Sequence, residues 1–346
     1  MHTTASRTKR RLAVSATAAA LVTLLTACSG GGAPTPTQTS EPTSAPEPTK
    51  PAPEKDTISI TQAPLTYYAP IWIADEMGYF ADEGISIEFA ESVPTGAGQI
   101  AMITSGQVDV IASAPASMIQ ALSEGLRTQF ISNIANFAET DEADSGAIIV
   151  TVDSPIQHPR ELNGKRVGVS SIQSMQQSKI AAVIDHDGGD SSTVEFIQVP
   201  PASMPGLLQT GEIDAASPLQ PGLTALLESG DFRRIHGANW VALGGVSGLS
   251  VASTPEWIEE HPNTARAIQA AVARGVEWAN DPANREALNE LLASRMNADV
   301  EVLKKWIPDP YASVITLESL EKLQQHLIDY GLLAQPVDLT LMLWEG

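Results

Sequence analysis

Two adjacent tyrosines, Tyr67 and Tyr68, stand in the loop that follows the first predicted strand, and Gln62 opens that loop. Their phenol and amide groups suit a small ligand that has an apolar or aromatic body and a few hydrogen-bond acceptors. In an open α/β sheet, ligands bind beyond the carboxyl ends of the strands. We therefore expect at least one of the tyrosines to contact a ligand, although both could instead pack on the hinge side of their lobe.

The same rule, applied to every predicted strand, selects further residues in the loops. The candidate ligand-binding residues are Gln62, Tyr67, Tyr68, Thr95, Gly96, Ser113 and Ala114 in the first half of the chain, and Ser171, Gln173 and Gln220 in the second. Helix amino ends near residues 70, 96 and 116 would point free amide donors at the same space. Lys179 could lean over this cleft, but we expect it on a solvated helix face, and we expect Trp72 in the core.

The chain lacks the usual residue patterns of catalytic and metal sites. No two of its six histidines have metal-ligand spacing, and its single cysteine cannot support them. The G-x-S-x-G motif of serine hydrolases does not occur. Residues 96–101 match the dinucleotide fingerprint G-x-G-x-x-A, but they follow the second strand of the series, and no acidic residue follows at the required distance. We expect no catalytic residue, no metal and no cofactor, and a hydrolytic enzyme that uses acidic pairs is the remaining alternative.

The single cysteine, Cys28, follows an apolar leader and indicates export. Four basic residues precede the apolar stretch 12–25, which is too short to anchor stably in a bilayer. A cysteine after Leu-x-Ala is similar to the lipobox of bacterial lipoproteins, where the thiol takes up lipid. We predict a lipoprotein signal peptide over residues 1–27 and lipid attachment at Cys28, on the outer face of the cytoplasmic membrane. An ordinary secretory leader is the alternative, and Arg10-Arg11 leaves a twin-arginine signal open.

A linker follows the predicted signal peptide. Residues 28–55 consist mainly of Pro, Thr, Ser, Gly and Ala and contain no large aliphatic residue. Such a segment cannot bury enough apolar surface to offset the entropy of ordering it, so we predict disorder over 28–55. The predicted globular body therefore begins near Asp56.

The charge of the chain limits the class of its partners. The formal net charge is −21, which repels nucleic acid and anionic lipid. Between Asp56 and Pro159, the only Lys or Arg is Arg127, so the first part of the body offers a ligand almost no formal positive charge. This pattern favours a site without an anion clamp, although an acid-rich surface that only improves solubility would look the same.

Hydrophobic patterning predicts alternating strands and helices. Strands are predicted over 57–61, 85–90, 108–112, 147–152, 167–170 and 245–253, and helices over 69–81, 96–105, 116–124, 263–280, 285–294, 300–306 and 317–329. This order indicates an α/β fold with parallel strands. We predict lobe 1 over residues 56–150 plus 245–346 and lobe 2 over residues 151–244, with two hinge crossings and a helical C-terminal tail.

Four segments together resemble a family of extracytoplasmic solute-binding proteins that includes nitrate, sulfonate, taurine and thiamine-precursor receptors. They are residues 69–85, with the run ADEMGYFADEGI; 104–110, TSGQVDV; 161–169, ELNGKRVGV; and 209–215, QTGEIDA. The resemblance implies the two-lobed type II periplasmic-binding-protein fold. It also implies a receptor, expected as a monomer, that captures a small molecule and delivers it to an ABC permease with its ATPase. A receptor that serves a membrane sensor kinase is the alternative.

The ligand class follows less directly from the sequence. Members of this family commonly carry an acidic residue before the proline at 221, but this chain has Gln220. The missing carboxylate argues against a cationic ligand, and the scarcity of cations argues against an anion held by arginine. We therefore expect a neutral heteroaromatic or vitamin-precursor-like ligand, with a sulfonate, nitrate or taurine-like anion as the alternative.

Overall fold

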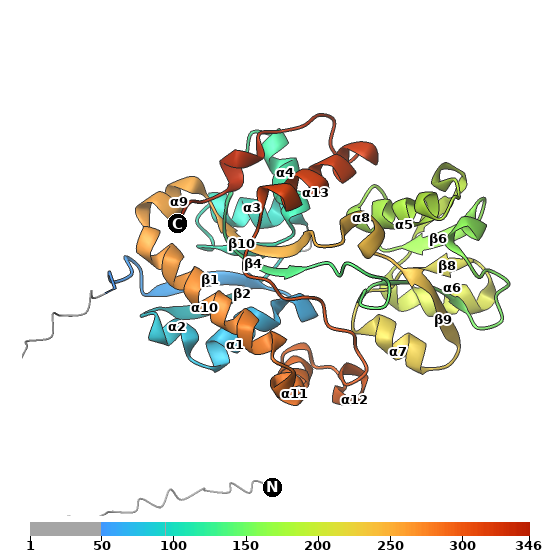
Figure 1. Ribbon diagram of the computed structural model, residues 1–346, viewed down its shortest axis with the longest axis horizontal. Helices are drawn as coiled ribbons and strands as arrows, with labels where there is room; N and C mark the ends of the chain where they lie inside the picture. Colours follow the sequence, from blue (N-terminus) through green and yellow to red (C-terminus); the bar gives the residue numbers. More distant parts are fainter. Residues whose placement is uncertain (1–49, 94) are drawn as a thin grey trace, which may run out of the picture. The chain divides into compact units, whose positions relative to one another are not determined.

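The protein is represented by a computed structural model that describes residues 50–93 and 95–346 (Figure 1). The predicted signal peptide, Cys28 and most of the predicted linker lie outside these residues. Within them, no helix combines the length and the hydropathy needed to span a bilayer.

The last residues of the predicted linker belong to the folded body, so the predicted end at residue 55 is wrong. The Glu54 carboxylate accepts hydrogen bonds from the amides of Asn263 (3.1 Å) and Thr264 (2.9 Å), in the first turn of a long helix. Lys55 bonds Asp109 at 2.5 Å. The free amides at a helix start attract a carboxylate, and this contact orders the chain before Asp56.

Two small sheets lie in the first unit, one of β1 (Thr57–Gln62) and β2 (Ser86–Glu91), the other of β3 (Ile111–Ser113), β10 (Ser247–Ser253) and β4 (Gln129–Asn136), and together we call them the first sheet. Strands β1 and β2 are parallel, and β10 pairs antiparallel with both β3 and β4. A parallel bridge between Ile60 and Val110 joins β1 to the segment just before β3. The strand order is therefore β2-β1-β3-β10-β4.

The second sheet repeats this order with strands β7 (Glu195–Gln198), β6 (Arg166–Val169), β8 (Ala215–Ala216), β5 (Ala147–Thr151) and β9 (Phe232–Gly237). Here β6 is parallel to both β7 and β8, and β5 is antiparallel to β8 and β9. In each sheet the antiparallel strand is the one that arrives from the other sheet, β10 after β9 and β5 after β4. The chain thus crosses twice between two α/β units of the same topology.

One predicted lobe boundary does not coincide with the sheets. The boundary after residue 150 falls inside β5, all of which pairs with strands of the second sheet. The antiparallel pairing extends from Ala147, because this residue already faces Gly237. The division of the chain into lobes otherwise stays a prediction.

The helices before the tail are α1 (Ala69–Glu76), α2 (Tyr79–Asp82), α3 (Gly96–Thr104), α4 (Pro115–Ser123), α5 (Met175–His186), α6 (Met204–Thr210), α7 (Gly222–Glu228) and α8 (Trp240–Leu243). The single helix predicted over 69–81 is in fact α1 and α2. Gly78 separates them because it adopts a left-handed φ of 72°. This conformation ends a helix, and residues with a side chain rarely adopt it.

The C-terminal part is helical, as predicted. It contains α9 (Pro255–Glu260), α10 (Pro262–Asn280), α11 (Arg285–Met296), α12 (Val300–Leu303) and α13 (Leu317–Asp329). Between α12 and α13 the chain contains no helix over residues 304–316, which begin with a turn at 304–305 and which we call the C-terminal connector (Figure 1). The connector links both units, because Lys305 forms an ion pair with Glu228 of α7 and Tyr311 bridges to Ala135 of β4.

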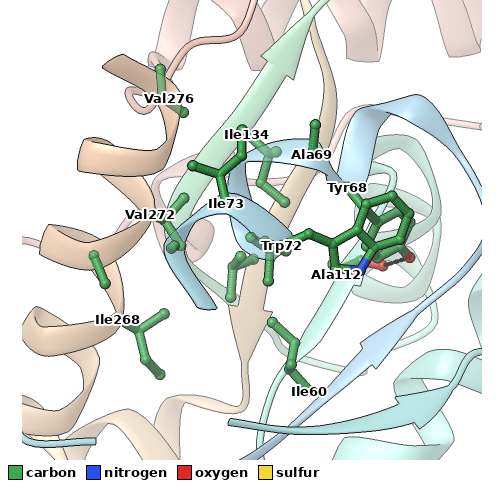
Figure 2. Close-up of a cluster of buried hydrophobic side chains, with 14 of the residues drawn as sticks. Ile60, Tyr68, Ala69, Trp72, Ile73, Ala112, Ile134, Ile268, Val272 and Val276 are labelled. Carbon is green, nitrogen blue, oxygen red and sulfur yellow. Dashed lines mark hydrogen bonds between the residues drawn. The ribbon is translucent and has the colours of Figure 1, made fainter. Parts of the chain in front are cut away.

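A large core lies between α1, α10 and the first sheet. Trp72 is 1% exposed, as expected for a core residue, and the Tyr68 ring stacks on it (Figure 2). The Tyr68 hydroxyl donates to the Ala112 carbonyl at 2.9 Å. Gly275 lets α10 approach α1 closely, because a Cβ at this position would lie 2.1 Å from the Pro70 carbonyl oxygen.

Candidate ligand-binding site

A cavity of about 230 Å³ lies where loops of both sheets meet. The first unit lines it with residues 65–67 after β1 and 114–116 at the start of α4, and the second with residues 217–220 after β8. The start of α5, the residues after β9, both crossings, the C-terminal connector and α13 also contribute to the lining. This is the place where open α/β sheets bind ligands, since the carboxyl ends of parallel strands point there.

Three of the ten predicted site residues, Tyr67, Ala114 and Gln220, line this cavity. The Tyr67 ring meets the Phe137 ring edge to face at 6.3 Å. The Gln220 amide donates to the Ser145 carbonyl at 2.8 Å and accepts from the Thr224 hydroxyl at 2.8 Å. Gln220 therefore also fixes the crossing near Ser145, and a ligand contact by any of the three stays a prediction.

Four predicted residues of the first unit lie outside the cavity lining, because local structure uses them. Tyr68 is in the core, and Ser113 is a buried residue of β3 that faces Ser250 of β10. Gln62 accepts a hydrogen bond from the Trp72 indole at 3.0 Å. Thr95 caps α3 by accepting from the Gly98 amide at 3.2 Å.

The other three predicted residues also lie away from the cavity. Gly96 is in a separate surface hollow beside α4. Gln173 lies in another hollow beside Tyr330. Ser171 is exposed, and its hydroxyl donates to the neighbouring carbonyl of Ile172 at 3.3 Å. The loop after β6 thus turns away from the cavity, which α5 lines instead.

Lys179 lines the cavity, so its predicted place on a solvated helix face is wrong. Its ammonium donates to the Asn239 side-chain oxygen at 2.5 Å and lies 4.7 Å from the centre of the Phe137 ring. Burial lowers the pKa of Lys179 to about 8, against the opposing charges of Asp144 and Asp309. At neutral pH the group still carries its proton, in surroundings that solvate it poorly.

Asp144 holds Asn239 in the orientation that Lys179 requires. Its carboxylate accepts from the Asn239 backbone amide at 2.7 Å and from the Asn239 side-chain amide at 2.6 Å. Because the NH₂ group faces Asp144, the amide oxygen faces Lys179. The Trp240 amide adds a third hydrogen bond to Asp144 at 3.0 Å.

Asp309 of the C-terminal connector also lines the cavity and is only 3% exposed. Its Oδ1 accepts from the Ser145 hydroxyl and from the Tyr67 hydroxyl, the latter at 3.3 Å. Burial raises the pKa of Asp309 to about 7, although both hydrogen bonds oppose the change. Burial and the Asp309 charge also raise the pKa of Tyr67 well above its usual range.

Two residues of the lining, Asp309 and Phe137, are absent from the residues predicted from the sequence. Asp309 stands between Pro308 and Pro310, and two prolines this close indicate an extended segment inside the predicted helical tail. That signal marks the segment but does not say which strand it follows. Phe137 carries no signal of its own in the sequence.

Much of the remaining lining is apolar. Met175, Leu219 and Leu323 contribute aliphatic surface to the same lining as the Phe137 ring. Across residues 50–93 and 95–346, no group of three or more His, Cys, Asp or Glu side chains is arranged to hold a metal ion. The arrangement can therefore enclose a small organic molecule and offer it one ammonium, one carboxyl group and several neutral hydrogen-bonding groups.

A comparison with protein families matches residues 65–285 to the family described as NMT1/THI5 like, which is well over half of the chain. The protein belongs to the NMT1/THI5-like family. This membership confirms the resemblance that the four sequence segments indicated. The two sheets of this NMT1/THI5-like protein and its cavity lie mostly within the matched residues, whereas the C-terminal connector with Asp309 lies beyond them.

Among characterised relatives of this NMT1/THI5-like protein is the taurine-binding periplasmic protein of Escherichia coli (strain K12). It is 24% identical over 246 residues, which cover 68% of this chain and 73% of the relative. Two solved structures have the same fold. The periplasmic aliphatic sulphonate binding protein SsuA from Escherichia coli superposes with a TM-score of 0.70, 17% identity, and coverage of 84% of this chain and 92% of that one.

The second solved structure is the periplasmic nitrate-binding protein NrtA from Synechocystis PCC 6803. It superposes on this NMT1/THI5-like protein with a TM-score of 0.64, 17% identity, and coverage of 82% of this chain and 83% of that one. These similarities confirm the predicted α/β periplasmic-binding-protein fold with a helical C-terminal region. At such identities they show the fold and not the ligand.

Proposed function

We propose that this protein is a solute-binding receptor of an ABC importer, which encloses one small organic molecule and delivers it to a permease with its ATPase. The observation that carries the proposal is a cavity at the strand ends that is lined by residues of both α/β units, in a chain of the NMT1/THI5-like family. Relatives named for binding taurine, aliphatic sulphonates and nitrate support it.

The cavity supports a closure mechanism. Tyr67 belongs to the first unit, Gln220 and Lys179 belong to the second, and all three line one space. A ligand that contacts both sides stabilises the closed arrangement over the open one by its difference in affinity for the two. The closed form would then be the one that docks on the permease.

Lys179 changes the balance between the two expected ligand classes. A neutral ligand would cover this half-buried ammonium without supplying a counter-charge, which is unfavourable. We therefore place an acidic group of the ligand at Lys179. A neutral heteroaromatic ligand is the second candidate, because the rings of Tyr67 and Phe137 present an aromatic corner to the cavity.

The site of action is proposed from the amino-terminal sequence. The apolar leader before Cys28 supports an extracytoplasmic receptor tethered by lipid to the outer face of the cytoplasmic membrane. We further propose that the receptor is a monomer. A sensor kinase is the alternative partner. Neighbouring genes for a permease and an ATPase would favour the importer, and a neighbouring sensor kinase gene would favour the alternative.

The test is a thermal-shift screen of the purified chain against sulfonates, carboxylates, amino-acid derivatives, pyrimidines and other vitamin precursors. A true ligand raises the apparent melting temperature in proportion to RT ln(1 + [L]/Kd) and is recovered unchanged after the protein is denatured. Lys179→Met should abolish the shift for acidic ligands, and Lys304→Met, an exposed lysine paired with Glu301, is the matched control. Conversion of the ligand to a product would contradict a pure receptor.

A further inference from the structure

Only two residues that line the cavity are of a type that carries a full charge near neutral pH, and they are of opposite sign. They are Lys179 of α5 and Asp309 of the C-terminal connector; the remaining described residues of the lining are apolar, hydroxyl, phenol or amide. They come from different segments of the fold, 130 positions apart in the sequence. A cavity built for a neutral solute would need neither of them.

The ammonium of Lys179 has neutral neighbours. It donates to the Asn239 amide oxygen at 2.5 Å and lies over the face of the Phe137 ring, 4.7 Å from its centre. Asp144, whose charge acts on Lys179, directs its carboxylate to amides of Asn239, Trp240 and Gly146. An ammonium has three donors, and the Asn239 oxygen uses one of them, so an anionic oxygen of a ligand can take another.

The carboxyl group of Asp309 also has neutral neighbours. Both the Ser145 and the Tyr67 hydroxyls donate to Oδ1, and neither donates to Oδ2. Oδ2 is therefore the oxygen on which a donor from the ligand would fall. A cationic donor suits it best, because a charge-assisted hydrogen bond compensates the burial of the carboxylate.

Lys179 and Asp309 are not partners of one another. The ion pairs found across residues 50–93 and 95–346 do not include a pair between them, although each influences the pKa of the other through space. The aliphatic side chains of Met175, Leu219 and Leu323 contribute to the same lining. A ligand that spans the two charged groups would place its apolar part against this surface.

We infer that the ligand is amphoteric, with an anionic group bound by Lys179, an amine or ammonium bound by Asp309, and an apolar body between them. This inference rests on the proposed receptor function and specifies its ligand class. It also assigns Asp309, contributed by the connector, the role of a specificity-determining residue. Position 220 carries a glutamine where members of the family commonly have an acidic residue. In this chain the connector supplies a carboxyl group instead, through Asp309.

The inference is tested with compounds of one shape and different charge. The probes are 4-(aminomethyl)benzoate, 4-methylbenzoate, 4-methylbenzylamine and 4-methylbenzamide, together with taurine, ethanesulfonate and ethylamine as a smaller series. Affinities are measured by isothermal titration calorimetry with the purified chain. We expect the member with both charges in at least one series to bind about ten-fold or more tightly than either member with one charge.

Two variants separate the two contacts. Asp309→Asn should reduce the affinity for the doubly charged compound to that of the matching anion, and should not weaken the binding of the anion itself. Lys179→Met should reduce the affinity for the doubly charged compound to that of the matching amine. Asp153→Asn and Lys304→Met, at exposed positions away from the cavity, are the matched controls and should change neither affinity.

Each result decides the inference. Equal or tighter binding of a singly charged or neutral probe in every series that binds overturns the inference and leaves the receptor in place, since a small molecule still binds. If no probe binds, the solute that co-purifies with the protein is released by denaturation and identified by mass spectrometry. A co-purified solute that carries both charges supports the inference. A co-purified solute that lacks one of the charges overturns the inference but not the receptor function. Absence of any bound solute, together with a failed screen, counts against the receptor as well.

Discussion

The Tyr67 hydroxyl donates a hydrogen bond of 3.3 Å to Oδ1 of Asp309, across 242 positions of the sequence. This contact joins the loop after β1 to the C-terminal connector, at the wall of the cavity. The neighbouring Tyr68 bonds the Ala112 carbonyl in the core instead. Two adjacent and chemically identical side chains thus have different roles, and several measurements can separate them.

Tyr67→Phe and Tyr68→Phe should have opposite profiles. Tyr67→Phe removes a donor to Asp309 and should weaken ligand binding. Tyr68→Phe removes a buried hydrogen bond in the core and should lower the free energy of unfolding by about 1–2 kcal/mol while leaving ligand affinity unchanged. Urea unfolding and calorimetric titration of both variants check this. Loss of ligand affinity in the Tyr68 variant alone would contradict the assignment of the two rings.

Asp309→Asn should flatten the pH dependence of stability. Burial raises the pKa of Asp309 to about 7 from its ordinary 3.8. Between these values the folded chain keeps a proton that the unfolded chain has released, so the free energy of unfolding falls as the pH rises through this window. Above about pH 7 the cost of the ionised, buried carboxylate amounts to a few kcal/mol.

The measurement compares ligand-free parent and variant in urea at about pH 5 and about pH 8. We expect the Asn variant to gain about 2–4 kcal/mol relative to the parent over this range. Asp153→Asn is the control, because Asp153 is exposed. An unchanged difference between parent and Asp309→Asn at the two pH values would show that Asp309 is ionised at both.

His326 should make the protein sensitive to acid. It is buried, its Nε2 lies 2.9 Å from the Ser178 hydroxyl, and its ring packs against Tyr330. Burial, and then the charge of Lys179, lower the pKa of His326 to about 4, against the charge of Asp329. As the pH falls from about 6.5 to about 4, the histidine binds a proton in the unfolded chain but not in the folded chain. The free energy of unfolding therefore decreases.

The effect is measured with His326→Gln in urea at about pH 7 and about pH 4. The variant should lose about 1–3 kcal/mol less stability than the parent over this range. His261→Gln is the matched control, because His261 contacts Trp257 rather than α5. A parallel decline of parent and His326→Gln would contradict the prediction.

Gly275→Ala should be strongly destabilising. Its new Cβ would lie 2.1 Å from the Pro70 carbonyl oxygen, so α10 would have to move away from α1. Overpacking of this kind costs about 1–3 kcal/mol, more than the small gain in helix propensity. Gly206→Ala in α6 is the matched control, since nothing lies within 4 Å of its Cβ, and it should be neutral or stabilising. Thermal unfolding of both variants decides between these outcomes.

Local patterns in the amino-acid sequence were enough to predict the alternation of strands and helices and the family, and they pointed to strand-end loops that line the candidate cavity. Apolar periodicity and helix-ending glycines are local features of the sequence, so they can be recognised without knowledge of the fold. The strand-end rule reached Tyr67, Ala114 and Gln220 because loops after parallel strands converge in any such sheet.

Which side chains face the cavity could not be predicted from the sequence, because it depends on how the elements pack together. In the short turn Thr66–Tyr68, one ring points to Phe137 and the next to Trp72, a choice made by the packing of α1 on the first sheet. Lys179 and Asp309 meet the same cavity because α5 and the connector are brought there by contacts between residues far apart in the chain. The charge of the site depends on this long-range packing, and the packing cannot be deduced from the spacing of residues along the sequence.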